Sequence, residues 1–254
     1  MAMYRVFLGA CLVLAMANPA HAAQSQFRDE DELNFYCLRQ AYPEIKSLAT
    51  EPDGNRWLIL ADGRRLDYDS IRQSMAQPYP LEPERPATPA GVAPGRVRPY
   101  ALFNALYGGN ADSVRKKLVQ TQFNGKRVTV AARLKEPLAN VSAALAQIAD
   151  PGIKRFLGPD GGFVWRKIAG EDRLSAHSYG IALDIGARHS PYWRWSKVTP
   201  HPMQAAYPRK IVEEFEKQGF IWGGKWHEYD LMHFEYRPEL ICKAKGLQAG
   251  RVAR

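Results

Sequence analysis

A proline-rich stretch divides this chain into two unequal parts. Residues 77–99 read QPYPLEPERPATPAGVAPGRVRP, and seven of these residues are proline. Proline fixes φ and lacks a backbone N–H donor, so a stretch this rich in proline can form neither a regular helix nor an inner strand of a sheet. We therefore expect an extended linker or wrapping arm over residues 77–99, with separately organised segments before and after it.

The segments on either side differ in size. Residues 24–76 are predicted to form a small N-terminal unit, with a helical pattern around 31–40. A hairpin follows, because RWLILADGRRLDYD places an Asp-Gly turn beside a run of apolar residues. Residues 100–246 are long enough to bury a core of their own and form the predicted main domain. Residues 247–254 form a basic tail.

The main domain mixes helical and strand patterns without regular alternation. Helical patterns occur over residues 100–120, after Pro137 and over 208–218; strand patterns occur over 126–134, 161–168, 180–186 and 233–238. Regular alternation would indicate a parallel sheet. Its absence favours an α+β fold, in which helices pack against an antiparallel sheet.

The first 23 residues have the features of a secretory signal peptide. Arg5 precedes an apolar run from Val6 to Ala17, and the small residues Ala20 and Ala22 suit a cleavage site before Ala23. The run is about 12 residues long, whereas a transmembrane helix needs about 20. We therefore expect a bacterial protein that is exported to the periplasm or secreted, without a transmembrane segment.

Cysteine content and charge fit an exported protein. Removal of the leader leaves Cys37 and Cys242, and an even number in an oxidising compartment permits a disulfide, although two free buried thiols would give the same sequence. The net charge is +9 for the whole chain. Outside the cell such a charge meets cell-wall polymers and anionic lipids more often than nucleic acid, so we expect no nucleic-acid partner. A solvated basic surface that aids solubility explains the same charge.

Two short stretches concentrate histidine and aspartate. RLSAHSYGIALDI (173–185) contains His177 and Asp184, and WHEYDLMHFEY (226–236) contains Asp230 and His233. A catalytic zinc ion takes three ligands from His, Asp or Glu, keeps one position open for water and needs a carboxylate nearby to accept a proton. We interpret His177, Asp184 and His233 as ligands of one zinc ion and Asp230 as the general base. A Ser-His-Asp triad is less favoured, because no serine or cysteine in these stretches has a clear activating context.

The two stretches resemble the motifs of the zinc D-alanyl-D-alanine carboxypeptidase family. This family includes VanY-type carboxypeptidases, vancomycin-resistance D-Ala-D-Ala dipeptidases and phage L-alanyl-D-glutamate endopeptidases. SAHSYGIALDI resembles Ser-x-His-x6-Asp and DLMHFEY resembles acid-x-x-His, within a similarity over residues 100–240. The resemblance implies a Hedgehog/DD-peptidase-like fold with zinc in a cleft on the sheet, held by the same three ligands, and Asp230 as base. Many members carry glutamate at that position, whereas some endopeptidase-type relatives carry aspartate.

The resemblance also implies an arginine, on the strand before the first motif, that stabilises the oxyanion of the reaction. Arg166 in GGFVWRKIAG lies where that strand is expected. Arg173 is the rival, and either arginine could instead pair with Glu171 or Asp172. Ser175 resembles the family's serine two residues before the ligand histidine, and it would either contact the substrate or cap a loop.

Three residues around the second motif have two interpretations each. Trp222 and Trp226 could line a cleft that binds a peptide stem, or they could belong to the core. Glu235 follows His233 at strand spacing, so it either orients that ligand or is solvated.

These observations predict an exported, monomeric zinc metallopeptidase. Its substrates would be peptidoglycan stem peptides, cut at bonds that involve D-amino acids, as a D-Ala-D-Ala carboxypeptidase or a murein endopeptidase. One alternative is a non-catalytic zinc-containing protein of the same fold that binds the cell wall or a partner. Another is a polyanion-binding protein, whose affinity would fall steeply with salt. The sequence does not decide which peptide bond is cut.

Overall fold

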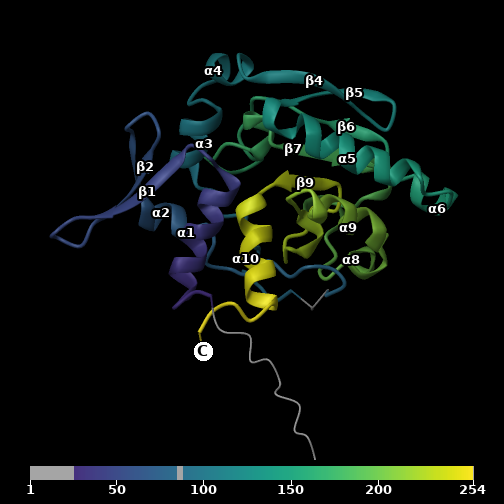
Figure 1. The fold of residues 1–254 in the computed structure, drawn as a ribbon. Helices are drawn as coiled ribbons and strands as arrows, with labels where there is room; N and C mark the ends of the chain where they lie inside the picture. Colours follow the sequence, from purple (N-terminus) through teal and green to yellow (C-terminus); the bar gives the residue numbers. More distant parts are fainter. Residues whose placement is uncertain (1–25, 85–87, 254) are drawn as a thin grey trace, which may run out of the picture.

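Figure 1 shows the computed structural model of the chain, which describes residues 26–84 and 88–253. The predicted signal peptide over residues 1–23 lies outside the described residues. None of the helices in the two described ranges has the length and apolar character needed to cross a membrane.

The residues before the proline-rich stretch form two helices and a small sheet. The elements are α1 (Glu30–Ala41), β1 (Ile45–Thr50), β2 (Arg56–Leu60), β3 (Arg65–Asp67) and α2 (Tyr68–Gln73). The strands pair antiparallel in the order β1-β2-β3. The side chain of Asp29 caps α1 by accepting a hydrogen bond from the N–H of Glu32, and Gly63 supplies the positive φ of 86° in the turn before β3. The predicted helix and hairpin are therefore present, and β1 adds a strand that the sequence analysis did not predict.

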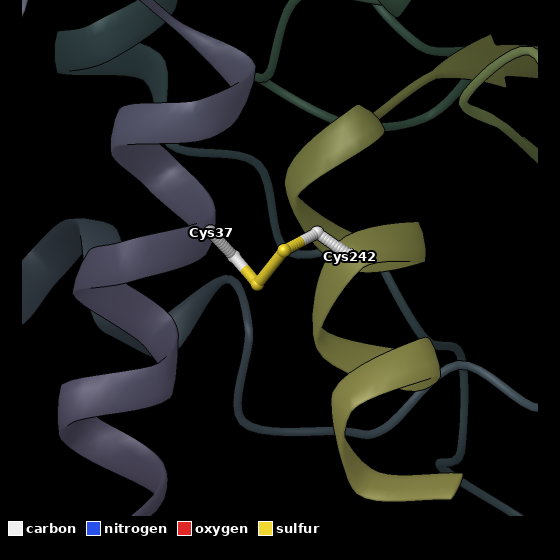
Figure 2. The surroundings of a disulfide bond; sticks show 2 residues. All are labelled: Cys37 and Cys242. Atoms are coloured by element: carbon white, nitrogen blue, oxygen red, sulfur yellow. A yellow bond between two sulfur atoms is a disulfide. The ribbon is translucent and has the colours of Figure 1, made fainter. Parts of the chain in front are cut away.

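The first helix is fastened to the last one. A disulfide joins Cys37 of α1 to Cys242 of α10 (Pro238–Gln248), with the two Cα atoms 5.5 Å apart (Figure 2). After the end of α1, the Tyr42 hydroxyl donates a hydrogen bond of 2.7 Å to Glu239 of α10. These contacts hold the N-terminal segment against the rest of the described protein. The division of the chain into a small N-terminal unit over residues 24–76 and a main domain over residues 100–246 stays a prediction.

The main sheet has the strand order β6-β7-β9-β8, and each neighbouring pair is antiparallel. Its strands are β6 (Pro159–Gly161), β7 (Ala182–Ile185), β8 (Phe220–Trp222) and β9 (His233–Tyr236). Helix α9 (Arg209–Lys217) covers one face, where Phe215 stacks on Phe234 with ring centroids 3.9 Å apart. A second antiparallel sheet, β4 (Leu118–Phe123) with β5 (Lys126–Ala131), packs against α5 (Lys135–Ala146) (Figure 1). Helices on antiparallel sheets confirm the predicted α+β class.

The remaining helices are short. They are α3 (Tyr100–Tyr107), α4 (Ala111–Arg115), α6 (Pro151–Lys154), α7 (Trp193–Ser196) and α8 (Pro202–Ala206), with 3-10 turns η1 (Ala132–Leu134), η2 (Ala176–Tyr179), η3 (Ala187–His189) and η4 (Gly223–Lys225). A helix over the whole of residues 100–120 was therefore wrong. Gly108, with a φ of 125°, interrupts it, and the last residues of that range join β4.

The expected strand over residues 161–168 was also wrong for most of its length. Only Gly161 belongs to a strand, β6, and the chain then runs extended without forming a continuous ladder. Its backbone instead bonds to separate segments: the N–H of Phe163 donates to Thr129 and that of Val164 donates to His177. The partners change along the segment, so no single neighbouring strand pairs with it.

The described residues of the proline-rich segment, 77–84 and 88–99, pack onto the main body as a wrapping arm. The ring N–H of Trp226 donates to the carbonyl of Pro94 at 2.7 Å, and the backbone N–H of His227 donates to Val92 at 2.9 Å. Nearer the start of the arm, the Tyr79 hydroxyl donates to the buried Glu216 at 2.6 Å. Backbone carbonyl groups of the arm, which proline retains, therefore accept hydrogen bonds from the region of the second motif.

Candidate metal centre

Two adjacent strands and one turn bring the predicted ligands together. Asp184 of β7 is the direct cross-strand partner of His233 in β9, so both side chains lie on the same face of the sheet. This face is opposite the one that carries Phe234 and packs against α9. His177 comes from η2, immediately before β7.

Gly180 makes the close packing of η2 possible. Its φ is 66°, in the left-handed region, and a Cβ atom here would lie 2.8 Å from the backbone nitrogen of Ala131. The N–H of Ala131 donates to the Gly180 carbonyl at 2.8 Å, which ties the turn to β5. A larger residue at 180 would displace the turn and the histidine on it.

Three side-chain atoms form a compact triangle. His177 Nε2 lies 3.1 Å from Asp184 Oδ1 and 3.3 Å from His233 Nδ1, and the latter two atoms are 3.1 Å apart. Both histidines are buried, with 3% and 4% of their surface exposed. Ligand atoms bound to a tetrahedral zinc ion at about 2.0–2.1 Å lie about 3.3 Å from one another, so this donor set fits such an ion. The group could hold a metal.

The other nitrogen of each imidazole ring is held by a hydrogen bond. His177 Nδ1 lies 2.7 Å from the carbonyl oxygen of Gly162, an acceptor to which this nitrogen must donate. His233 Nε2 lies 3.3 Å from Oε2 of Glu235. Each bond holds one ring proton away from the triangle, so the nitrogen that faces the triangle can offer its lone pair to a metal once it is deprotonated.

Glu235 itself is fully buried and paired with cations. Arg98 Nη2 donates to Glu235 Oε2 at 2.6 Å, and Arg237 Nη1 donates to Oε1 at 3.4 Å. Burial alone would raise the pKa of Glu235, but the charge of Arg98 and the hydrogen bond of His233 hold this pKa well below its usual range. Glu235 is therefore a carboxylate that orients His233, rather than a solvated residue.

Charge also shifts the pKa values of two of the triangle's groups. Burial favours the neutral form of Asp184, yet the neighbouring His177 holds the pKa of Asp184 well below its usual range. Burial likewise favours neutral His233, but hydrogen bonds to Asp184 and Glu235 raise the pKa of His233 to about 9. A cation bound at the triangle would also stabilise the ionised carboxylates of Asp184 and Glu235.

Asp230 has the properties expected of a general base. Burial, with a contribution from the charge of Asp184, raises the pKa of Asp230 to about 6. Its Oδ1 atom is buried without a hydrogen-bond partner among the described residues. An unsatisfied buried carboxylate oxygen is costly and calls for a partner such as a water or a substrate group. Together with the donor set, it supports a site that holds a metal and its water.

These residues open into one cavity of about 330 Å³, the metal-site cavity. Other residues that line it are Arg96, Arg98, Arg166, Ile168, Ala169, Ser175, Tyr192, Arg194, Trp195, Trp226 and Met232. Its wall is therefore rich in arginine and aromatic residues, a combination suited to a peptide that carries carboxylates.

Some of the other predicted site residues border the metal-site cavity and some do not. Arg166 borders the metal-site cavity with an exposed side chain, whereas Arg173 pairs with Glu171. Ser175 borders the cavity and also caps η2, because its Oγ accepts the N–H of His177. Trp226 is a cavity residue.

Trp222 lies in the core instead. It is the cross-strand partner of Phe234, so its ring lies on the sheet face opposite His233. Trp222 does not line the metal-site cavity, so this geometry does not support a substrate contact by Trp222 there.

Sequence reasoning missed Arg98. It lies in the wrapping arm, 137 positions before Glu235, and no local pattern connects the two residues. Arg194 was missed for a similar reason, because α7 consists of only four residues and has no usable periodicity.

Comparison with protein families yields one match. Residues 169–236 match the family model of D-alanyl-D-alanine carboxypeptidase, a range that includes all three proposed ligands and Asp230. The match confirms the resemblance found in the two motifs and supports a peptidase function of this general type. Comparisons with curated proteins and with solved structures found no match.

Proposed function

Starting from a segment with the pattern of the D-alanyl-D-alanine carboxypeptidase family, we propose that this protein is an exported zinc peptidase of peptidoglycan. Its substrates are stem peptides or cross-links, cut at bonds that involve D-amino acids. The observation that carries the proposal is the triangle of His177 Nε2, Asp184 Oδ1 and His233 Nδ1, with separations of 3.1–3.3 Å. It shares one cavity with Asp230, whose Oδ1 has no hydrogen-bond partner among the described residues.

The triangle would hold the metal ion through these three atoms. When bound there, zinc polarises a substrate carbonyl and lowers the pKa of water in its open position. The orientation of both rings is set by the protein, because Gly162 and Glu235 accept the hydrogen bonds of the remaining ring nitrogens. The ligand atoms therefore need little rearrangement on binding.

Asp230 moves the proton. A base with a pKa of about 6 is mostly ionised at neutral pH, yet its conjugate acid still gives up its proton readily. Asp230 accepts the proton of the attacking water and returns it to the leaving amine.

Arginine side chains bind the negative charge of the substrate. Arg166 is exposed beside the cavity. Its guanidinium would stabilise the oxyanion that develops on the scissile carbonyl. Arg96 and Arg194 line the same cavity and suit the free carboxylates of a stem peptide. Ser175 and Trp226 supply a hydroxyl and an aromatic face for the peptide backbone.

Digestion of purified peptidoglycan tests this function. The mature protein is incubated with peptidoglycan with and without a zinc chelator, and the released fragments are identified by mass spectrometry. Chelator-sensitive release of D-alanine would identify a carboxypeptidase, and conversion of cross-linked dimers to monomers would identify an endopeptidase. A preparation with one zinc ion per chain and no new fragments would contradict the proposal and favour a non-catalytic cell-wall protein.

A further inference from the structure

A buried arginine of the wrapping arm, Arg98, contacts a residue next to the proposed metal ligands. Arg98, which is only 8% exposed, donates from Nε to both carboxylate oxygens of Glu235 at 3.1 Å and from Nη2 to Oε2 at 2.6 Å. This two-pronged geometry fixes the plane of the carboxylate as well as its position. Arg98 lies outside residues 169–236, the range that matches the family model.

The carboxylate that Arg98 holds is the one that contacts His233. Oε2 of Glu235 accepts the short bond from Arg98 and also lies 3.3 Å from His233 Nε2. Arg237 is the other cation at Glu235, but its contact is longer, at 3.4 Å to Oε1, and its Nε donates to Glu239 instead. Arg98 is therefore the main constraint on the oxygen that faces the imidazole.

We propose that Arg98 is a positioning residue of the metal centre, acting through Glu235 to fix the ring of His233 with Nδ1 directed at Asp184 and His177. This inference rests on the part of the proposed function that assigns metal binding to these three side chains. It gives the wrapping arm a role in the site itself, because a residue of the arm sets the orientation of a ligand on β9.

A direct contact between Arg98 and the substrate is the competing assignment. Arg98 borders the metal-site cavity, and its Nη1 atom is buried with no hydrogen-bond partner in the described part of the chain. The two assignments predict different measurements. A positioning residue changes the affinity for metal in the absence of substrate, whereas a substrate-binding residue changes KM alone.

The test compares Arg98→Gln with the matched control Arg96→Gln in the full mature chain. Arg96 is also an arginine of the arm that borders the cavity, but its ion pairs are with Glu171 and Glu228 rather than with Glu235. Zinc affinity is measured by competition with a chromophoric chelator, and the absorption spectrum of the cobalt(II) form reports the ligand geometry. We expect zinc binding to weaken about 10- to 100-fold in Arg98→Gln, with an altered cobalt spectrum, and to stay within about twofold of the parent in Arg96→Gln.

A second variant distinguishes the loss of ligand positioning from a folding defect. Arg98→Gln leaves the buried Glu235 with only its longer contacts to Arg237 and His233, so a folding defect would show as a lost thermal transition in the metal-free protein. The double variant Arg98→Gln/Glu235→Gln removes both charges and is still expected to bind zinc at least about tenfold more weakly. Arg98→Lys keeps the charge but not the two-pronged contact, and should fall between parent and Arg98→Gln.

Parental zinc affinity in a folded Arg98→Gln protein would overturn the inference, as would a higher KM with unchanged zinc affinity. Failure of the proposed function looks different: the parent would bind zinc and release no fragments from peptidoglycan, while the effect of Arg98→Gln on zinc affinity would persist.

Discussion

Asp184 and His233 are direct partners across β7 and β9, and their side-chain atoms Oδ1 and Nδ1 lie 3.1 Å apart. The antiparallel register therefore aligns the two motifs, which are 49 positions apart in the sequence. A slip of one residue would place His233 on the face covered by α9 and abolish the site. The predictions below follow from this arrangement.

Loss of a ligand should remove the metal. In His177→Ala the triangle keeps two donors, so we expect zinc affinity to fall by more than about 100-fold, beyond the effect of an outer-shell change. Metal content after dialysis and peptidase activity report the loss. His189→Ala is the control, since His189 is exposed and outside the triangle. Equal metal content in both variants would refute the ligand assignment.

Replacing Asp230 should separate catalysis from metal binding. Asp230→Asn keeps the size of the side chain but cannot accept the proton, so kcat should fall about 10²- to 10⁴-fold. Zinc content measured by atomic emission should remain at one ion per chain. Undiminished hydrolysis in the zinc-loaded variant would mean that another residue is the base.

Zinc affinity should rise with pH. The pKa of His233 in the metal-free protein is raised to about 9, so its ring holds a proton at neutral pH that zinc must displace. Below that pKa, this histidine alone should weaken zinc binding about tenfold for each pH unit. Competition titrations at about pH 6, 7 and 8 measure the slope. Affinity that does not change over this range would contradict the coupling.

The two candidate arginines should behave differently. Arg166→Ala removes the cavity residue that we propose to stabilise the oxyanion, and should lower kcat/KM about 10²-fold or more. Arg173→Ala removes the pair with Glu171 and should leave kcat/KM within about twofold, since an exposed ion pair contributes little. Initial rates on a defined stem peptide decide between them. The reverse pattern would assign the role to Arg173.

Reduction of the disulfide should destabilise the protein without damaging the site. The bond between Cys37 and Cys242 joins residues 205 positions apart, and its loss should lower the free energy of unfolding by about 3–5 kcal/mol. Denaturant unfolding with and without a reductant measures the change, and the double variant Cys37→Ala/Cys242→Ala should match the reduced protein. Unchanged stability would show that the helices hold together without the bond.

The local part of the site could be read from the sequence because strand geometry repeats every two residues. That period places Asp184 opposite the apolar face of its strand and puts Glu235 on the side of His233, and the residue types suggest zinc. The α+β class followed from the irregular mixture of patterns.

The long-range part could not be predicted in this way. The contact between Arg98 and Glu235 depends on how the arm crosses the main body, and proline-rich sequence has no periodicity that would indicate the path. Two interpretations of Trp222 stayed open because only the pairing with Phe234 shows which face its ring occupies. Likewise, the break at Gly108 depends on a backbone conformation that a helical pattern does not reveal.

The disulfide between Cys37 and Cys242 turns most of the molecule into a covalent ring. Phe27 and Val252 pair in a short parallel bridge just outside that ring, so the two ends of the described chain lie side by side. A protease that cuts once at an exposed turn, such as the one around Gly54 between β1 and β2, opens the ring but releases no fragment. Both pieces stay in one molecule until the bond is reduced, and the arm and both motifs lie together on the longer piece.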